Sequence, residues 1–215
     1  LRRIIISDVS GIGRNRRPQI EGSLTAYIKN SIDMGGVLDF DRGFLDDYTL
    51  LGYLDTMRAF GRLGGHCYFV EEDDEAEEGF ASRSASWPAP DFPGDLGKDG
   101  RKLLGYLECA ARILDIPRVR AYGYDDLELA IAERRVLEDK RIEEILSKGD
   151  ETRTRIIPAL KEAVANRSFD SCPYHYLRLV EELLPNHART LLERALVGIW
   201  PELPPGLTWL RTPRP

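Results

Sequence analysis

Cysteine is scarce in this chain, with three residues among 215. They are Cys67, Cys109 and Cys172, and so odd and sparse a set does not form a disulfide framework. No apolar run approaches the roughly 18 residues that a membrane-spanning helix needs, and no signal peptide is visible. These absences predict an intracellular protein, in the cytoplasm or in an organelle interior, with no membrane partner.

Net positive charge is lacking as well, since the formal net charge is −6. No global field therefore attracts nucleic acid. A local basic patch remains in the segment from Arg2 to Arg17, and nucleic acid could bind only there; solvated or carboxylate-paired arginines are the common alternative. With 42% hydrophobic and 31% charged residues, the chain has a globular balance and not the composition of a disordered protein.

The N-terminal part, residues 1–70, shows patterns of both strands and helices. A β-branched run predicts a strand over residues 3–7, and a second strand is expected over residues 66–70. Apolar residues at helical spacing predict helices over residues 18–34 and 44–57. We therefore expect a mixed α/β part here.

The composition changes after this part. Residues 71–78 hold seven carboxylates in eight positions, and residues 82–100 are rich in Ser, Pro, Gly and Asp. Like charges repel, and such a segment has little apolar surface to offset its ordering entropy. The sequence predicts a mobile loop or linker over residues 71–99, which is the best candidate for a domain boundary.

The remaining chain up to residue 200 has helical patterns almost throughout. Alternating charges between Glu133 and Glu144 predict an exposed face laced with salt bridges. The fold class is therefore α+β and predominantly helical, with a helical bundle over residues 100–200. Helices are expected over residues 102–116, 125–149, 151–165, 174–184 and 186–200.

The last segment, residues 201–215, contains five prolines. Proline fixes φ and removes a backbone donor, so we expect an extended tail that completes neither a helix nor a central strand. Its apolar residues must be buried on their own domain or on a partner. Leu207 and Trp209 are therefore the candidate partner-binding residues, and Trp209 is predicted to be at least partly buried.

One acidic pair suggests metal chemistry. Asp39 and Asp41 at positions i and i+2 of a strand would point the same way and could share a divalent cation. Such pairs hold Mg²⁺ in phosphoryl and nucleotidyl transfer. This pair, followed by His66 on a glycine-preceded strand, resembles the core of archaeo-eukaryotic primase-polymerases. The resemblance implies metal binding by Asp39 and Asp41 and nucleotide-phosphate contact by His66.

Two further resemblances cover short fragments. The same pair, followed by Gly43, is similar to the nucleophile motif of haloacid-dehalogenase-type phosphatases, which implies Asp39 as nucleophile and Asp41 as acid. Asp8, after an isoleucine strand, is similar to the metal-binding start of nucleotide cyclases. The alternative for Asp39 and Asp41 is the common one, in which they cap a helix or are solvated near a turn.

Cys172, His175 and His187 offer three zinc ligands, but closed structural zinc sites need four. A buried cysteine and two ordinary histidines are therefore favoured over a zinc site. A hydrolytic Cys–His pair lacks an identifiable acid or amide to orient it.

No complete catalytic set emerges from these patterns. The sequence favours a non-enzymatic helical subunit or interaction module of an intracellular protein assembly, with other protein chains as partners and no cofactor. The alternative is a metal-dependent phosphoryl- or nucleotidyl-transfer enzyme that uses Asp39, Asp41 and His66 with Mg²⁺ or Mn²⁺.

The alternative predicts a metal-dependent gain in stability. Two adjacent carboxylates repel without a counter-ion, so millimolar Mn²⁺ should raise the melting temperature of the wild-type protein. Asp39→Asn combined with Asp41→Asn should abolish that rise, as measured by thermal unfolding with and without Mn²⁺. A wild-type protein whose melting temperature ignores the metal would contradict the phosphoryl-transfer hypothesis.

Overall fold

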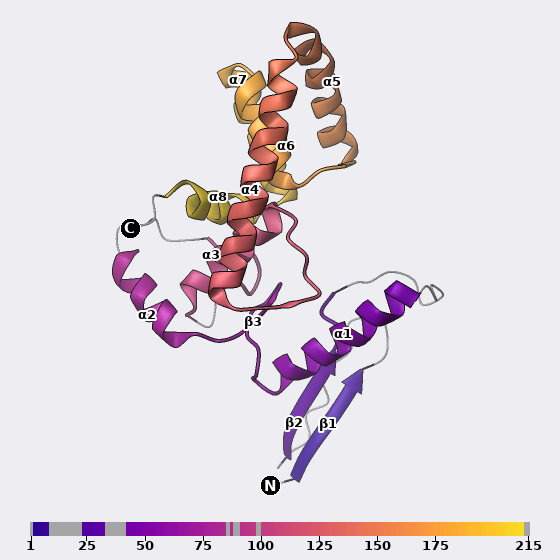
Figure 1. Ribbon diagram of the computed structural model, residues 1–215, viewed down its shortest axis with the longest axis vertical. Coiled ribbons are helices and arrows are strands. Elements are labelled where there is room, and N and C mark those ends of the chain that lie inside the picture. The colour runs from indigo at the N-terminus through magenta and orange to yellow at the C-terminus, as the bar shows by residue number, and fades with distance from the viewer. Residues whose placement is uncertain are drawn as a thin grey trace. The chain divides into compact units, whose positions relative to one another are not determined.

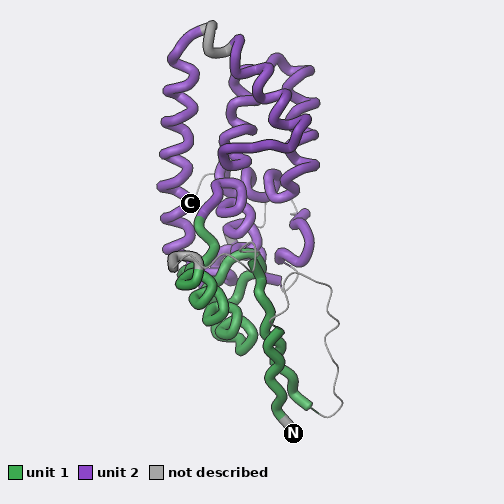
Figure 2. Tube along the Cα trace, turned by 90° about the vertical axis from the view of Figure 1, so that its right-hand side faces the viewer, with its two compact units in different colours: residues 1–73, 117–123 green, residues 74–116, 124–215 purple. Residues whose placement is uncertain are grey.

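The computed structural model describes residues 2–8, 23–32, 42–84, 87, 91–97 and 100–212. These residues form eight helices and two two-stranded sheets, so the predicted fold class, predominantly helical α+β, is confirmed (Figure 1). The chain divides into two compact units (Figure 2). Unit 1 comprises residues 1–73 and 117–123, and unit 2 comprises residues 74–116 and 124–215. None of the described helices combines the length and the apolar character that a membrane crossing requires.

The first sheet of unit 1 consists of two parallel strands, β1 (Arg2–Asp8) and β2 (Ser23–Lys29). The strand predicted over residues 3–7 is confirmed, whereas the helix predicted over residues 18–34 is wrong where β2 forms. The apolar residues of this segment satisfy helical spacing, but its aromatic and β-branched side chains also suit a strand. Pairing with β1, a neighbour in space and not in sequence, decides between the two.

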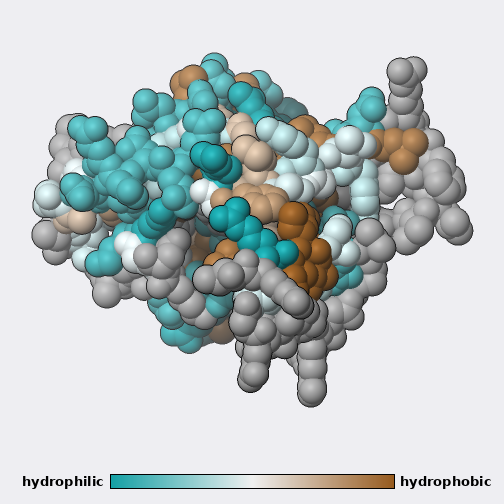
Figure 3. Space-filling model, turned by 90° about the horizontal axis from the view of Figure 1, so that it is seen from below, coloured by the Kyte–Doolittle hydropathy of each residue, from teal (hydrophilic) through white to brown (hydrophobic). Residues whose placement is uncertain are grey.

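The core of unit 1 lies beneath helix α1 (Arg42–Ala59), which contacts β2 and confirms the helix predicted over residues 44–57. A second parallel pair joins β3 (Phe69–Val70) to β4 (Ala121–Tyr122). The buried residues of this core are Leu51, Leu54, Leu63 and Phe69. Other apolar side chains remain exposed, and small apolar patches lie among hydrophilic residues in the space-filling view (Figure 3).

Unit 2 contains the other seven described helices. Helix α3 is its centre, because ten of its twelve residues are buried and it contacts α2, α4 and α8. Helix α6 in turn contacts α4, α5 and α7. The C-terminal helical part of the predicted fold class is confirmed, but residues 117–123 within it belong to unit 1. The helices are α2 (Asp74–Arg83), α3 (Lys102–Ile113), α4 (Tyr124–Ser147), α5 (Asp150–Asn166), α6 (Pro173–Leu183), α7 (Asn186–Ile199) and α8 (Leu203–Arg211).

Helix α2 corrects the loop predicted over residues 71–99 where the helix forms, at residues 74–83. Three of its four acidic residues lie in the first helical turn, where negative charge is favourable. The carboxylate of Glu77 accepts hydrogen bonds from the backbone N–H groups of Leu103 (3.0 Å) and Leu104 (2.8 Å). It also accepts one from the Tyr124 hydroxyl (2.9 Å). Glu77 thus caps the start of α3, which has no side-chain cap of its own. Glu77 is thus the partly buried carboxylate of the acidic run, whereas the other six carboxylates are exposed.

Helix α8 corrects the extended tail predicted over residues 201–215 where the helix forms, at residues 203–211. Pro204 and Pro205 fall in its first turn, where backbone N–H groups have no helical partner, so proline costs nothing there. Gly206 then lets α8 approach α3 closely, because a Cβ at this position would lie 2.8 Å from Ile113 Cδ1 and 3.0 Å from the carbonyl oxygen of Cys109.

Trp209 of α8 belongs to an aromatic cluster with Phe80, Trp87 and Tyr106. Its ring centroid lies 6.1 Å from that of Phe80 and 6.1 Å from that of Trp87, and Trp87 lies 5.2 Å from Tyr106. Trp209 is only 6% exposed, which confirms the prediction that it is at least partly buried. The burial is against its own unit. The assignment of Leu207 and Trp209 to a partner stays a prediction.

The aromatic cluster should contribute measurably to stability. Trp209→Ala is expected to lower the free energy of unfolding by about 3 kcal/mol, because it removes a large buried side chain and leaves a cavity. Leu191→Ala on α7, where the side chain is 57% exposed, is the control and should change it by less than about 0.5 kcal/mol. Chemical denaturation of both variants measures this, and equal effects would contradict a structural role for α8.

Candidate functional site

The residues predicted for metal chemistry are only partly described. Asp39 and Asp41 lie outside the described residues, as do the arginines of the basic patch beyond β1. His66 is exposed and lies in a bend before β3, so its predicted place on a strand is wrong. The metal-dependent alternative stays a prediction.

The three possible zinc ligands lie in different surroundings. His187 is exposed near the start of α7, whereas Cys172 is buried directly before α6. Burial raises the pKa of the Cys172 thiol to about 11, so the thiol is protonated at neutral pH. Within the described part of the chain, no three His, Cys, Asp or Glu residues are grouped as a metal site.

The most unusual group of unit 2 is the carboxylate of Glu138, which is completely buried on α4. One oxygen lies 3.0 Å from Nδ1 of His175 on α6. The other oxygen accepts a hydrogen bond from the Arg141 guanidinium at 3.0 Å and lies 3.2 Å from the guanidinium of Arg134. A buried charge is costly unless it is paired and hydrogen-bonded, and here both oxygens have partners. The cluster therefore fixes α6 against α4.

Sequence reasoning missed this cluster because it assigned the charges between residues 133 and 144 to an exposed face. That assignment is wrong for Glu138. A signal was present: Glu138 shares the helical face of Leu127, Ile131 and Ile142, which are all buried. A carboxylate at an apolar, core-facing position indicates a buried partner. The partner itself lies 37 residues away, and no local pattern identifies it.

A second polar group joins α6 to α8. The carboxylate of Glu181 on α6 accepts hydrogen bonds from Arg211 of α8 and, at 2.9 Å, from Arg178. Burial alone would raise the pKa of Glu181, but the hydrogen bonds from Arg211 and Arg178 outweigh it and lower the pKa. From α4, Arg135 donates to the carbonyl oxygen of Leu210 at 2.5 Å. Ion pairs therefore hold α8 in place at the end opposite its prolines.

A pocket of about 320 Å³ lies between α5 and α6. Its polar lining consists of Ser168, Asp170, His175 and Tyr176. The Tyr176 hydroxyl donates a hydrogen bond to the Asp170 carboxylate at 2.5 Å. The same hydroxyl accepts a hydrogen bond from the Asp170 backbone N–H at 3.1 Å. The hydrogen bond from Tyr176 is the main cause that lowers the pKa of Asp170, so this carboxylate is ionised at neutral pH. The pocket thus combines one fixed carboxylate with one imidazole.

Loss of the buried carboxylate should weaken the whole unit. Glu138→Ala is expected to lower the free energy of unfolding by about 3 kcal/mol, because His175, Arg134 and Arg141 lose their shared partner. Glu133→Ala, on the exposed face of the same helix, should change it by less than about 0.5 kcal/mol. Chemical denaturation separates the two, and a Glu138 variant as stable as the Glu133 variant would contradict this role.

No protein-family model matches this chain, and no curated protein and no solved structure matches it either.

Proposed function

We propose that this chain is a helical interaction module, a non-enzymatic subunit of an intracellular protein assembly, and that it docks through the outer face of α4. This outer face consists of Leu129, Val136 and Leu137. The observation that carries the proposal is their exposure, since the three side chains are 58%, 52% and 54% accessible to solvent.

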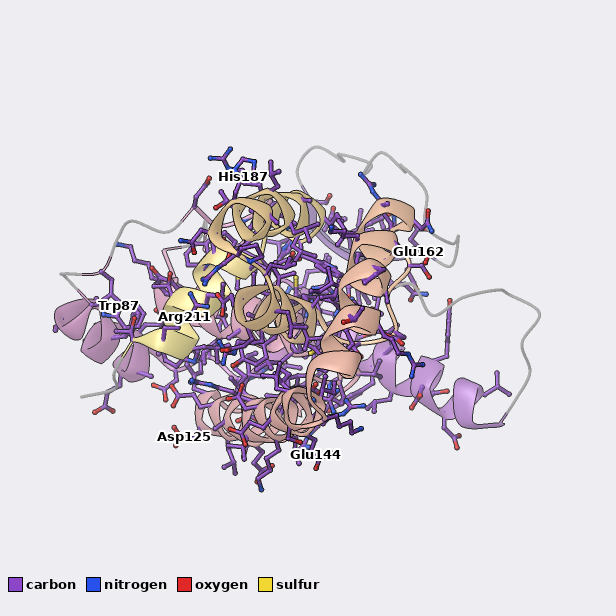
Figure 4. All side chains as sticks on the ribbon, turned by 90° about the horizontal axis from the view of Figure 1, so that it is seen from above. Trp87, Asp125, Glu144, Glu162, His187 and Arg211 are labelled. Atoms are coloured by element: carbon purple, nitrogen blue, oxygen red, sulfur yellow. The ribbon has the colours of Figure 1, made fainter. Side chains whose placement is uncertain are left out.

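The three residues share one side of the helix. Val136 and Leu137 follow Leu129 by seven and eight positions, and in a helix such positions lie above one another. Glu138, which faces the core, lies on the opposite side. The labelled side chains of Asp125 and Glu144 point away from the other helices of unit 2 and mark the exposed side (Figure 4).

Folding does not account for this arrangement. A single exposed apolar side chain is ordinary, but several on one face of one helix are typical of an interaction site. Leu129, Val136 and Leu137 keep most of their surface in water, so they contribute little to the core. Their apolar surface can be withdrawn from water by a partner, at about 25 cal/mol for each Å² buried.

The surrounding charges indicate the kind of partner. Exposed acidic residues outnumber exposed basic ones around the outer face, so a partner with the opposite balance is favoured. An amphipathic helix with an apolar stripe and basic flanks fits both features. The exposed acidic residues are Asp125, Asp126, Glu133, Glu143 and Glu144, and the exposed basic ones are Lys140 and Arg141.

The cysteines support the intracellular part of the proposal. Cys67, Cys109 and Cys172 are not joined to one another by disulfides. Cysteines that stay reduced are typical of a reducing compartment.

A designed helical peptide tests the outer face directly. We expect a peptide with leucine at heptad spacing and lysine elsewhere to bind the wild-type protein. Leu129→Glu with Val136→Glu should weaken binding at least about tenfold, because each residue would otherwise contribute more than about 1 kcal/mol when buried. Leu191→Glu on α7, an equally exposed leucine, is the matched control and should bind like wild type. Fluorescence anisotropy of the labelled peptide gives the affinities.

The same peptide with glutamate in place of lysine should bind far more weakly. Two results would contradict the proposal. One is a peptide that binds the double variant as well as it binds the wild type. The other is a Leu191→Glu variant that loses as much affinity as the double variant, since binding would then not depend on α4.

A further inference from the structure

We propose that the pocket between α5 and α6 binds a small, largely apolar amine, with its ammonium group at Asp170 and a hydroxyl group at His175. This site is separate from the outer face of α4, and no residue belongs to both.

The pocket exists because small residues face α6 from α5. Ile156, Ala159, Leu160 and Ala163 all line it, and this spacing places them on one side of α5. Two of the four are alanines, so their short side chains leave the space between the helices unfilled. Leu179 closes the apolar wall from α6. At about 320 Å³ the pocket is near the lower end of the range for ligand sites, roughly 300–1,000 Å³, and suits a small molecule.

The charge of the lining favours a cation. The Asp170 carboxylate accepts a hydrogen bond from the Tyr176 hydroxyl, and the Asp170 backbone N–H donates to the same hydroxyl. No Lys or Arg is among the lining residues. The neighbouring Phe169 and Tyr176 rings lie 5.0 Å apart in an edge-to-face arrangement, and aromatic faces also attract an ammonium group. An anion would be repelled by the Asp170 carboxylate, and no Lys or Arg of the lining offsets that repulsion.

His175 provides the second polar contact. Its Nδ1 is engaged by the buried carboxylate of Glu138, which accepts hydrogen bonds and does not donate them. Nδ1 therefore donates to Glu138, which leaves Nε2 as the ring nitrogen that can meet a ligand. Since His175 lines the pocket, a ligand hydroxyl group can form a hydrogen bond with Nε2. The ligand class is thus an amine with a hydroxyl-bearing apolar body.

Two matched probes test the charge preference with the full chain. Tyramine has a phenol ring, a hydroxyl and an ammonium group, and 4-hydroxyphenylacetate has the same ring and hydroxyl with a carboxylate. We expect isothermal titration calorimetry to show that tyramine binds about five- to tenfold more tightly, because the charge at Asp170 attracts one probe and repels the other. Equal affinities for the two probes, or no binding of tyramine, would overturn the proposal.

Variants then locate the binding. Asp170→Asn should reduce the affinity for tyramine to about that for 4-hydroxyphenylacetate, whereas Glu162→Gln on the outer side of α5 should leave it unchanged (Figure 4). Ala159→Phe should fill the pocket and abolish binding, with circular dichroism as the check that the helices persist. If Ala159→Phe retains wild-type affinity, or if Glu162→Gln lowers the affinity as much as Asp170→Asn, tyramine binds elsewhere and the assignment of this pocket is wrong.

Discussion

The buried carboxylate of Glu138 is the constraint on which the packing of α4 to α7 depends. A charge that is completely inaccessible to water requires partners, and Glu138 finds them in His175, Arg134 and Arg141. The bond to His175 sets how α6 lies on α4. Helix α6 also contacts α5 and α7, so the position of these helices follows from the same pair. The orientation of α4 is set too, because turning Glu138 inward turns Leu129 and Val136 outward.

A second set of contacts secures the C-terminal helix. Gly206 allows α8 to approach the backbone of α3, and Trp209 joins the aromatic cluster. Arg211 then pairs with Glu181 on α6. Packing thus determines the position of α8, and the ion pair adds a geometric requirement that apolar contacts alone do not supply. A proline-rich segment becomes a helix because its prolines fall in the first turn and its apolar residues find a surface.

Local patterns predicted those parts of the fold that local interactions determine. Apolar spacing, with proline at the ends, identified the helices between residues 102 and 200, and a β-branched run identified β1. The errors share one cause. Residues 23–29 become a strand because β1 pairs with them, Glu77 is ordered by the start of α3, and α8 forms on the surface of α3. Each outcome depends on a partner far away in sequence, which no window of neighbouring residues contains.

The candidate sites could be predicted from sequence to an even smaller extent, for a related reason. Fold stability selects the core-facing residues, such as Glu138, but leaves the opposite face of α4 free to be polar. Leucine and valine at positions 129, 136 and 137 therefore need an explanation other than folding. The same reasoning applies to Ala159 and Ala163, since larger side chains would fill the space against α6 and pack more tightly. At both places the sequence departs from what stability alone would favour, and such departures are expected where a protein binds something else.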